Sequence, residues 1–157
     1  MRSLRYALVF ILLLVSLAMF TVLDAAGRAE TCKPTETDTL GPFYKSGAPV
    51  RSAVGKGYIM TGTVKSAKDC SVIKGARIEF WLVNPEGSYD DDHRATVFSD
   101  VKGFYRFESN APQSYFGRPP HIHIMVSAEG HKTLITQHYP EKEKTRATFD
   151  LVLVPSQ

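Results

Sequence analysis

A short stretch near residue 120 contains side chains that can bind a metal ion and orient a substrate. Tyr115 and Arg118 supply a phenol and a guanidinium, and His121 and His123 follow within the next five residues. The segment Ile122–Ser127 is apolar and branched, which predicts a strand, and residues two apart on a strand point to the same face. The two imidazoles would then lie side by side as half of a metal site. The alternative is a pair of exposed strand histidines beside a loop tyrosine.

The elements that must position these residues are predicted to be short strands separated by turns. The predicted strands are 58–64, 76–83, 95–99, 104–108, 122–128, 133–138 and 148–154. Regular short strands without a helix of useful length indicate an all-β fold, an antiparallel β-sandwich. Residues 31–57 contain several Gly and Pro and little periodicity, so they are predicted to wrap over the sandwich as an irregular N-terminal arm.

The first 29 residues are predicted to be a signal peptide. Arg2 and Arg5 form a short basic region, residues 7–23 are almost wholly apolar, and small residues stand at 27 and 29. The protein is therefore expected to be exported, to the periplasm or beyond. An uncleaved membrane anchor is the alternative, because the apolar run is long for a signal and short for a membrane span.

Residues 30–157 are sufficient for a single domain with a substantial core. The formal charge of the whole chain is +3, and much of it lies in the predicted signal segment. The remaining charge gives no argument for binding nucleic acid or an acidic membrane surface.

The two cysteines of the chain, Cys32 and Cys70, both lie in the part predicted to be exported. An even number of cysteines in an oxidising compartment favours a disulfide. Such a bond would tie the start of the arm to a turn between two strands. The alternatives are two free thiols or, less favoured, a metal site that uses both cysteines.

Three motifs follow one another along the chain. They are Trp-x-x-Asn-x-x-Gly-x-Tyr at 81–89, Pro-x-x-Tyr at 112–115 and Arg-Pro-Pro-His-Ile-His at 118–123. Together with Gly-Pro-Phe-Tyr at 41–44, they resemble the catalytic domain of intradiol ring-cleavage dioxygenases, which include catechol 1,2-dioxygenases and protocatechuate 3,4-dioxygenases. The resemblance extends from about residue 39 to residue 154. Each motif alone is weak, but their combination in this order is highly specific.

The resemblance implies one non-haem ferric ion per chain, bound by Tyr89, Tyr115, His121 and His123. Iron(III) is a hard cation that favours anionic oxygen, and imidazole suits iron generally. A free tyrosine has a pKa of about 10, so a strong Lewis acid is needed to make the phenolate its resting form. The implied reaction is cleavage of a catechol-type ring by O2, giving a cis,cis-muconate-type diacid.

The resemblance also implies roles for further residues. Tyr115 would leave the metal and take up a substrate proton, Arg118 would stabilise negative charge that develops on the substrate ring, and Gln137 would lie beside that arginine. The arm residues implied to line the substrate pocket are Leu40, Gly41 and Pro42. The expected partners are a small catecholic molecule and O2.

Two other functions compete with this interpretation. The segment 75–81 followed by 100–107 also resembles transthyretin-like and carboxypeptidase-regulatory-like modules, which are not enzymes. A copper or zinc site built on His121 and His123 is the second alternative.

The sequence departs from the family in two places. No segment is expected to supply the helical dimerisation region of catechol 1,2-dioxygenases, and the loop between Tyr115 and Arg118 is short. The resemblance therefore gives neither the particular catechol nor the oligomeric state.

Overall fold

The computed structural model describes residues 32–156, so the predicted signal peptide lies outside the described residues. The described chain forms eight strands. They are β1 (Gly57–Ser66), β2 (Arg77–Trp81), β3 (Arg94–Phe98), β4 (Phe104–Asn110), β5 (Ile122–Ser127), β6 (Leu134–His138), β7 (Arg146–Thr148) and β8 (Leu151–Leu153). Within residues 32–156 there is no helix long and apolar enough to cross a membrane.

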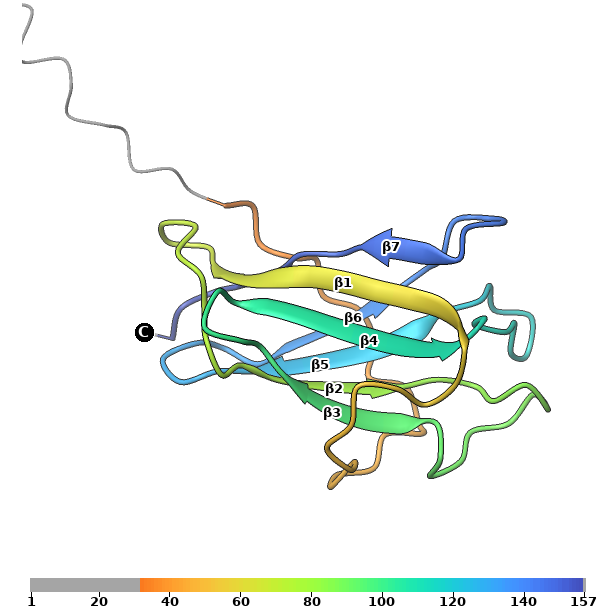
Figure 1. The fold of residues 1–157 in the computed structure, drawn as a ribbon. Coiled ribbons are helices and arrows are strands. Elements are labelled where there is room, and N and C mark those ends of the chain that lie inside the picture. Colours follow the sequence, from red (N-terminus) through yellow and green to blue (C-terminus); the bar gives the residue numbers. More distant parts are fainter. Residues whose placement is uncertain (1–31, 157) are drawn as a thin grey trace, which may run out of the picture.

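The strands form two packed sheets, which confirms the predicted all-β sandwich (Figure 1). One sheet has the order β3-β2-β5-β6 and is antiparallel throughout. In the other sheet β4 pairs with β1 antiparallel, whereas β7 and β8 pair with β1 in parallel. The first strand of the described residues therefore pairs with the last two.

The predicted final strand 148–154 is interrupted, and its first part begins earlier than expected, at β7. At the interruption the backbone of Phe149 crosses so close to Gly62 that a Cβ on Gly62 would clash with the Phe149 carbonyl oxygen. The Asp150 carboxylate then accepts a hydrogen bond from the Thr63 amide at 2.9 Å. The Asp150 side chain thus takes the place of one backbone hydrogen bond between the strands.

The core lies between the two sheets and follows from the alternation along each strand. In β1 every second residue is buried, as expected for a strand with one face toward the core. Phe80 of β2 and Phe107 of β4 stack across the sandwich with their ring centroids 4.1 Å apart. Aromatic contacts of this kind fix the spacing of the sheets that position the site.

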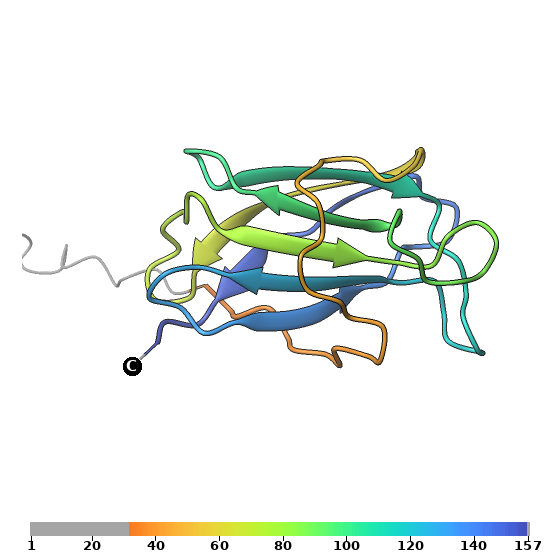
Figure 2. The ribbon, with the colours of Figure 1, turned by 90° about the horizontal axis from the view of Figure 1, so that it is seen from below.

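Residues 32–56, called the strap below, cross the outer face of the β3-β2-β5-β6 sheet (Figure 2). The backbone amide of Asp38 donates to Ile135 of β6, and the Pro49 carbonyl accepts from Thr96 of β3. The predicted irregular arm is therefore present and ordered. Because the strap covers this face, Glu79 and Trp81 of β2 are each only 2% exposed.

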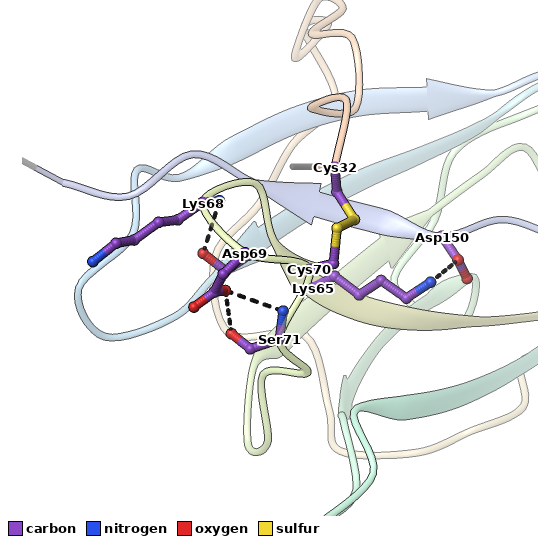
Figure 3. Close-up of a disulfide and its surroundings, with 8 residues drawn as sticks. Cys32, Lys65, Lys68, Asp69, Cys70, Ser71 and Asp150 are labelled. Atoms are coloured by element: carbon purple, nitrogen blue, oxygen red, sulfur yellow. Dashed lines mark hydrogen bonds and ion pairs between the residues drawn. A yellow bond between two sulfur atoms is a disulfide. The ribbon is translucent and has the colours of Figure 1, made fainter. Parts of the chain in front are cut away.

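A disulfide joins Cys32 to Cys70, as predicted (Figure 3). It attaches the start of the strap to the loop that follows β1. Beside it, Lys65 and Asp150 form an ion pair with 2.7 Å between nitrogen and oxygen. β1 ends and β2 begins at this loop. The disulfide therefore lies at one end of the sandwich, whereas the end of β2 and the start of β5 lie at the opposite end.

Candidate metal centre

Three donor atoms converge where β2 finishes and β5 starts. The Tyr89 hydroxyl oxygen lies 3.1 Å from His121 Nε2 and 3.1 Å from His123 Nε2. The two ring nitrogens are 3.2 Å apart. His123 belongs to β5, His121 directly precedes it, and Tyr89 extends from the loop between β2 and β3. We call this group the Tyr89 triangle.

The loop that presents Tyr89 is organised by the Asn of its motif. The Asn84 side chain accepts from the Ser88 amide at 2.9 Å and donates to Asp90 at 2.7 Å, which brackets Tyr89 on both sides. Gly87 has a φ of 84°, a left-handed conformation that glycine adopts without steric cost. The spacing of the motif therefore encodes a tight loop that holds one phenol in place.

Burial favours the uncharged form of both imidazoles of the triangle. Burial lowers the pKa of His121, and burial together with the neighbouring His121 lowers the pKa of His123 to about 4. His121 Nδ1 lies 2.8 Å from the Pro119 carbonyl, a partner that only an N–H can satisfy, so Nε2 carries the lone pair. Because this lone pair points toward two other donor atoms, His121 Nε2 can bind a cation together with them.

The triangle fits a metal ion of the predicted type. Donor atoms about 3 Å apart can each lie about 2 Å from a shared ion. Within residues 32–156, no three His, Cys, Asp or Glu side chains form a possible metal site. The third donor atom beside the two histidines is the Tyr89 phenol oxygen. Burial raises the pKa of Tyr89 to about 12, although the Arg118 charge opposes this. Only a strongly Lewis-acidic ion such as Fe(III) would hold such a phenol as phenolate.

Neighbouring residues fix the orientation of the His123 ring. Trp81 stacks on it with the centroids 4.9 Å apart and an angle of 5° between the planes. On the strap, a Cβ at Gly41 would lie 2.9 Å from the ring. Gly41, predicted to line a substrate pocket, thus packs against a candidate ligand.

Tyr115 lies beside the triangle without being part of it. Its ring is edge-on to Tyr89, with the centroids 5.2 Å apart. Among the described residues, its hydroxyl makes no hydrogen bond to the three atoms of the triangle. Tyr115 and Arg118 are joined by two backbone hydrogen bonds, of 3.3 and 2.9 Å, which close a two-residue turn.

A cavity of about 290 Å³ opens directly over the triangle. Its lining consists of Pro42, Phe43, Tyr89, Tyr115, Phe116, Arg118, His121 and His123. Of the three strap residues predicted to bind substrate, Pro42 lines this cavity, whereas Leu40 and Gly41 do not. Phe43 was not anticipated, and it stacks on Tyr89 with the ring centroids 4.4 Å apart.

Arg118 is held by a small polar network, as its predicted pairing with Gln137 requires. Arg118 Nη2 donates to Gln137 Oε1 at 2.7 Å and to the Tyr139 hydroxyl at 3.0 Å. Gln137 Nε2 donates to the Thr39 carbonyl at 2.7 Å, and Tyr139 donates to Asp38 at 2.9 Å. The network links the guanidinium to the strap. Tyr139 was missed, although it lies two residues beyond Gln137.

A second histidine–tyrosine contact lies away from this cavity. His138 Nε2 is 2.7 Å from the Tyr58 hydroxyl, and the two residues are 9% and 2% exposed. Both side chains of this contact are therefore buried. The ring of Phe149 covers His138, with the centroids 5.2 Å apart.

The chain is similar in sequence to proteins of known activity, although no family model matches it. The chain is 31% identical to the catechol 1,2-dioxygenase of Candida albicans, over 76% of this chain and 52% of that protein. It is 28% identical to the chlorocatechol 1,2-dioxygenase of Pseudomonas putida, over 75% of this chain and 58% of that protein. The chain spans about half the length of the curated relatives it matches.

Solved structures agree with the sequence relatives. The dioxygenase domain of a dioxygenase–carbohydrate-binding fusion from Streptomyces sp. SirexAA-E superposes with a TM-score of 0.71 at 25% identity. That match covers 79% of this chain and 100% of that domain. The hydroxyquinol 1,2-dioxygenase of Pseudomonas putida DLL-E4 superposes with a TM-score of 0.70 at 19% identity, which bears on the fold alone.

Proposed function

We propose that the chain is an intradiol ring-cleavage dioxygenase, like the catechol and chlorocatechol 1,2-dioxygenases to which it is similar, and that it uses O2 to cleave a catechol-type ring between the two hydroxyl-bearing carbons. The product would be a cis,cis-muconate-type diacid. The observation that carries this proposal is the Tyr89 triangle and Arg118 on one cavity. A phenol oxygen within 3.1 Å of two buried imidazoles, on a cavity that Arg118 also lines, favours a metal-dependent enzyme over a non-enzymatic module.

The cofactor we propose is one ferric ion per chain. Tyr89, His121 and His123 would hold it, with Tyr115 as the fourth ligand from the adjoining turn. When bound, the ion would supply a Lewis acid that favours the deprotonated forms of phenols and makes a bound catecholate reactive toward O2.

The residues around the cavity would bind and orient the substrate. The Arg118 guanidinium lines the cavity and is fixed by Gln137, so its positive charge is in place before negative charge develops on the ring. The Tyr115 oxygen, which would be a phenolate when it holds the ion, would take up a proton from an incoming catechol hydroxyl. Phe43 and Pro42 cover the site from the strap and restrict water.

We also propose that residues 30–157 are the catalytic domain of an exported protein and that residues 1–29 are its signal peptide. The apolar run at 7–23 supports this assignment, as does the disulfide, which is typical of oxidising compartments. The proposed partners are a small catechol and O2.

The test is a visible absorption spectrum of the purified protein, with iron quantified and oxygen uptake followed on the same sample. We expect about one ferric ion per chain, a broad phenolate-to-iron band, and oxygen consumption on addition of catechol. A protein that stays colourless and consumes no oxygen after reconstitution with ferric iron would overturn the proposal.

A further inference from the structure

The turn between Tyr115 and Arg118 has an unusual residue at its tip. Phe116 has a φ of 46° and Gly117 a φ of 76°, so both central residues are left-handed. Two-residue hairpin turns of this kind favour Asn-Gly or Asp-Gly, because a side chain with a Cβ is strained there. A phenylalanine at the first position is therefore a poor choice for the turn alone.

The same side chain is also poorly placed for stability. Phe116 is 91% exposed, more than any other large apolar residue among those described. A ring left in water contributes little burial free energy, so the fold gains almost nothing from it. Backbone strain and apolar exposure at one position are a reason to look for a role in binding.

The position of Phe116 indicates what it could bind. It lines the cavity over the Tyr89 triangle, and its ring contacts Tyr115 edge-on with the centroids 5.0 Å apart. Pro42, which is also exposed, lies on the lining contributed by the strap. Because only two residues connect Tyr115 to Arg118, nothing else in this turn covers the cavity. A substituent on a bound ring that projects out of the cavity would pass an aromatic surface.

From this geometry we propose that Phe116 determines specificity, by recognising catechols that carry an aromatic substituent. The inference rests on the proposed ring-cleaving function and names its substrate class. The phenyl ring of Phe116 packs against the substituent, while the catechol ring occupies the cavity below. Contacts between aromatic rings are strong enough to change the selectivity between two substrates several-fold, even where the contact does not involve the reacting atoms.

The test compares catechol with 4-phenylcatechol on the iron-loaded full protein. Phe116→Asn removes the ring and suits the left-handed turn, and Phe116→Tyr retains an aromatic ring. Val101→Asn is the matched control, because Val101 is an 81% exposed apolar residue in the turn between β3 and β4, at the opposite end of the sandwich. For each variant, kcat/KM is measured for both substrates, and Kd is measured for both under anaerobic conditions, without turnover.

In Phe116→Asn, we expect the 4-phenylcatechol-to-catechol ratio to fall about fivefold in both kcat/KM and affinity. Phe116→Tyr should restore most of the ratio, and Val101→Asn should not change it. A ratio that stays within about twofold in Phe116→Asn, or that falls equally in Val101→Asn, would overturn this inference and leave the proposed function standing. If the wild-type protein binds neither catechol, the proposed function fails together with it.

Discussion

Two clusters in this protein pair buried histidines with a tyrosine hydroxyl, and only one of them has the geometry of a metal centre. Tyr58 and His138 form a single contact of 2.7 Å, which each group can satisfy as donor or acceptor. In the Tyr89 triangle three atoms approach one another within 3.1–3.2 Å. At least one of its nitrogens presents a lone pair to the other two atoms.

The contrast shows which features identify a site. Both clusters are buried and both contain short contacts, so neither property separates them. Size does not separate them either, because the hollow beside Tyr58 and His138 is about 520 Å³ and the cavity over the triangle about 290 Å³. The distinguishing feature is that several uncharged donor atoms converge on one point beside a fixed positive charge, Arg118.

The change expected to have the largest effect is Tyr89→Phe. It leaves two neutral imidazoles without an anionic oxygen, so we expect ferric iron to be lost and catechol turnover to fall by about a thousandfold. Iron per chain, the visible spectrum and oxygen uptake measure the effect. Circular dichroism should confirm that the variant is folded. Full iron occupancy and turnover in this variant would show that the triangle is not the metal centre.

The next largest effect is expected from removing the disulfide with Cys32→Ser and Cys70→Ser together. The bond closes a sequence separation of 38 residues, and its loss should lower the free energy of unfolding by about 2–4 kcal/mol. Because the strap carries Gly41 against His123, we also expect catechol turnover to fall. Thermal unfolding and oxygen uptake test both effects. If stability and turnover are both unchanged, the disulfide does not hold the strap over the metal centre.

Tyr58→Phe makes the same chemical change as Tyr89→Phe in the other cluster. It leaves the buried His138 nitrogen without a partner, so the free energy of unfolding should fall by about 1–3 kcal/mol. Iron content and turnover should stay at wild-type levels. Urea unfolding and an iron assay on the same preparation make the comparison. A loss of iron would show that the two clusters are coupled.

The smallest expected effect is a dependence of stability on pH. Burial lowers the pKa of His138, although the charge of Glu141 opposes this. The unfolded chain then binds more protons than the native protein below a pH of about 6.5, and stability falls as the pH decreases. His138→Gln should reduce this slope, by at most about 1.4 kcal/mol per pH unit. Urea unfolding of both proteins between about pH 7 and pH 5 measures it; equal slopes would contradict a buried neutral histidine.

The sequence predicts the strands well where a local pattern defines them. The local sequence pattern placed six strands close to their observed positions, and the seventh over the last two strands. It could not reveal the interruption between β7 and β8, because that depends on the approach of Phe149 to Gly62, far away in the chain. The burial of Glu79 was equally hidden, since the strap that covers it has no periodicity.

The site shows the same division between local and distant information. The spacing of His121 and His123 and the loop around Tyr89 are local, and the structure brings all three together. The contacts of Phe43 with Tyr89 and of His138 with Phe149 were not predicted, because in each pair the neighbour comes from another element of the fold. A period-two search from Gln137 would have found Tyr139, which lies on the same face of the chain.

The parallel pairing of β1 with β7 and β8 has a consequence for the timing of folding. A chain that has emerged from the ribosome only as far as β6 can pair β1 with β4, but the opposite edge of β1 stays open. Those hydrogen bonds form only once residues 146–153 are available. Contacts between such distant segments slow folding. The sheet that contains β1 should therefore be completed only after residues 146–153 have been synthesised.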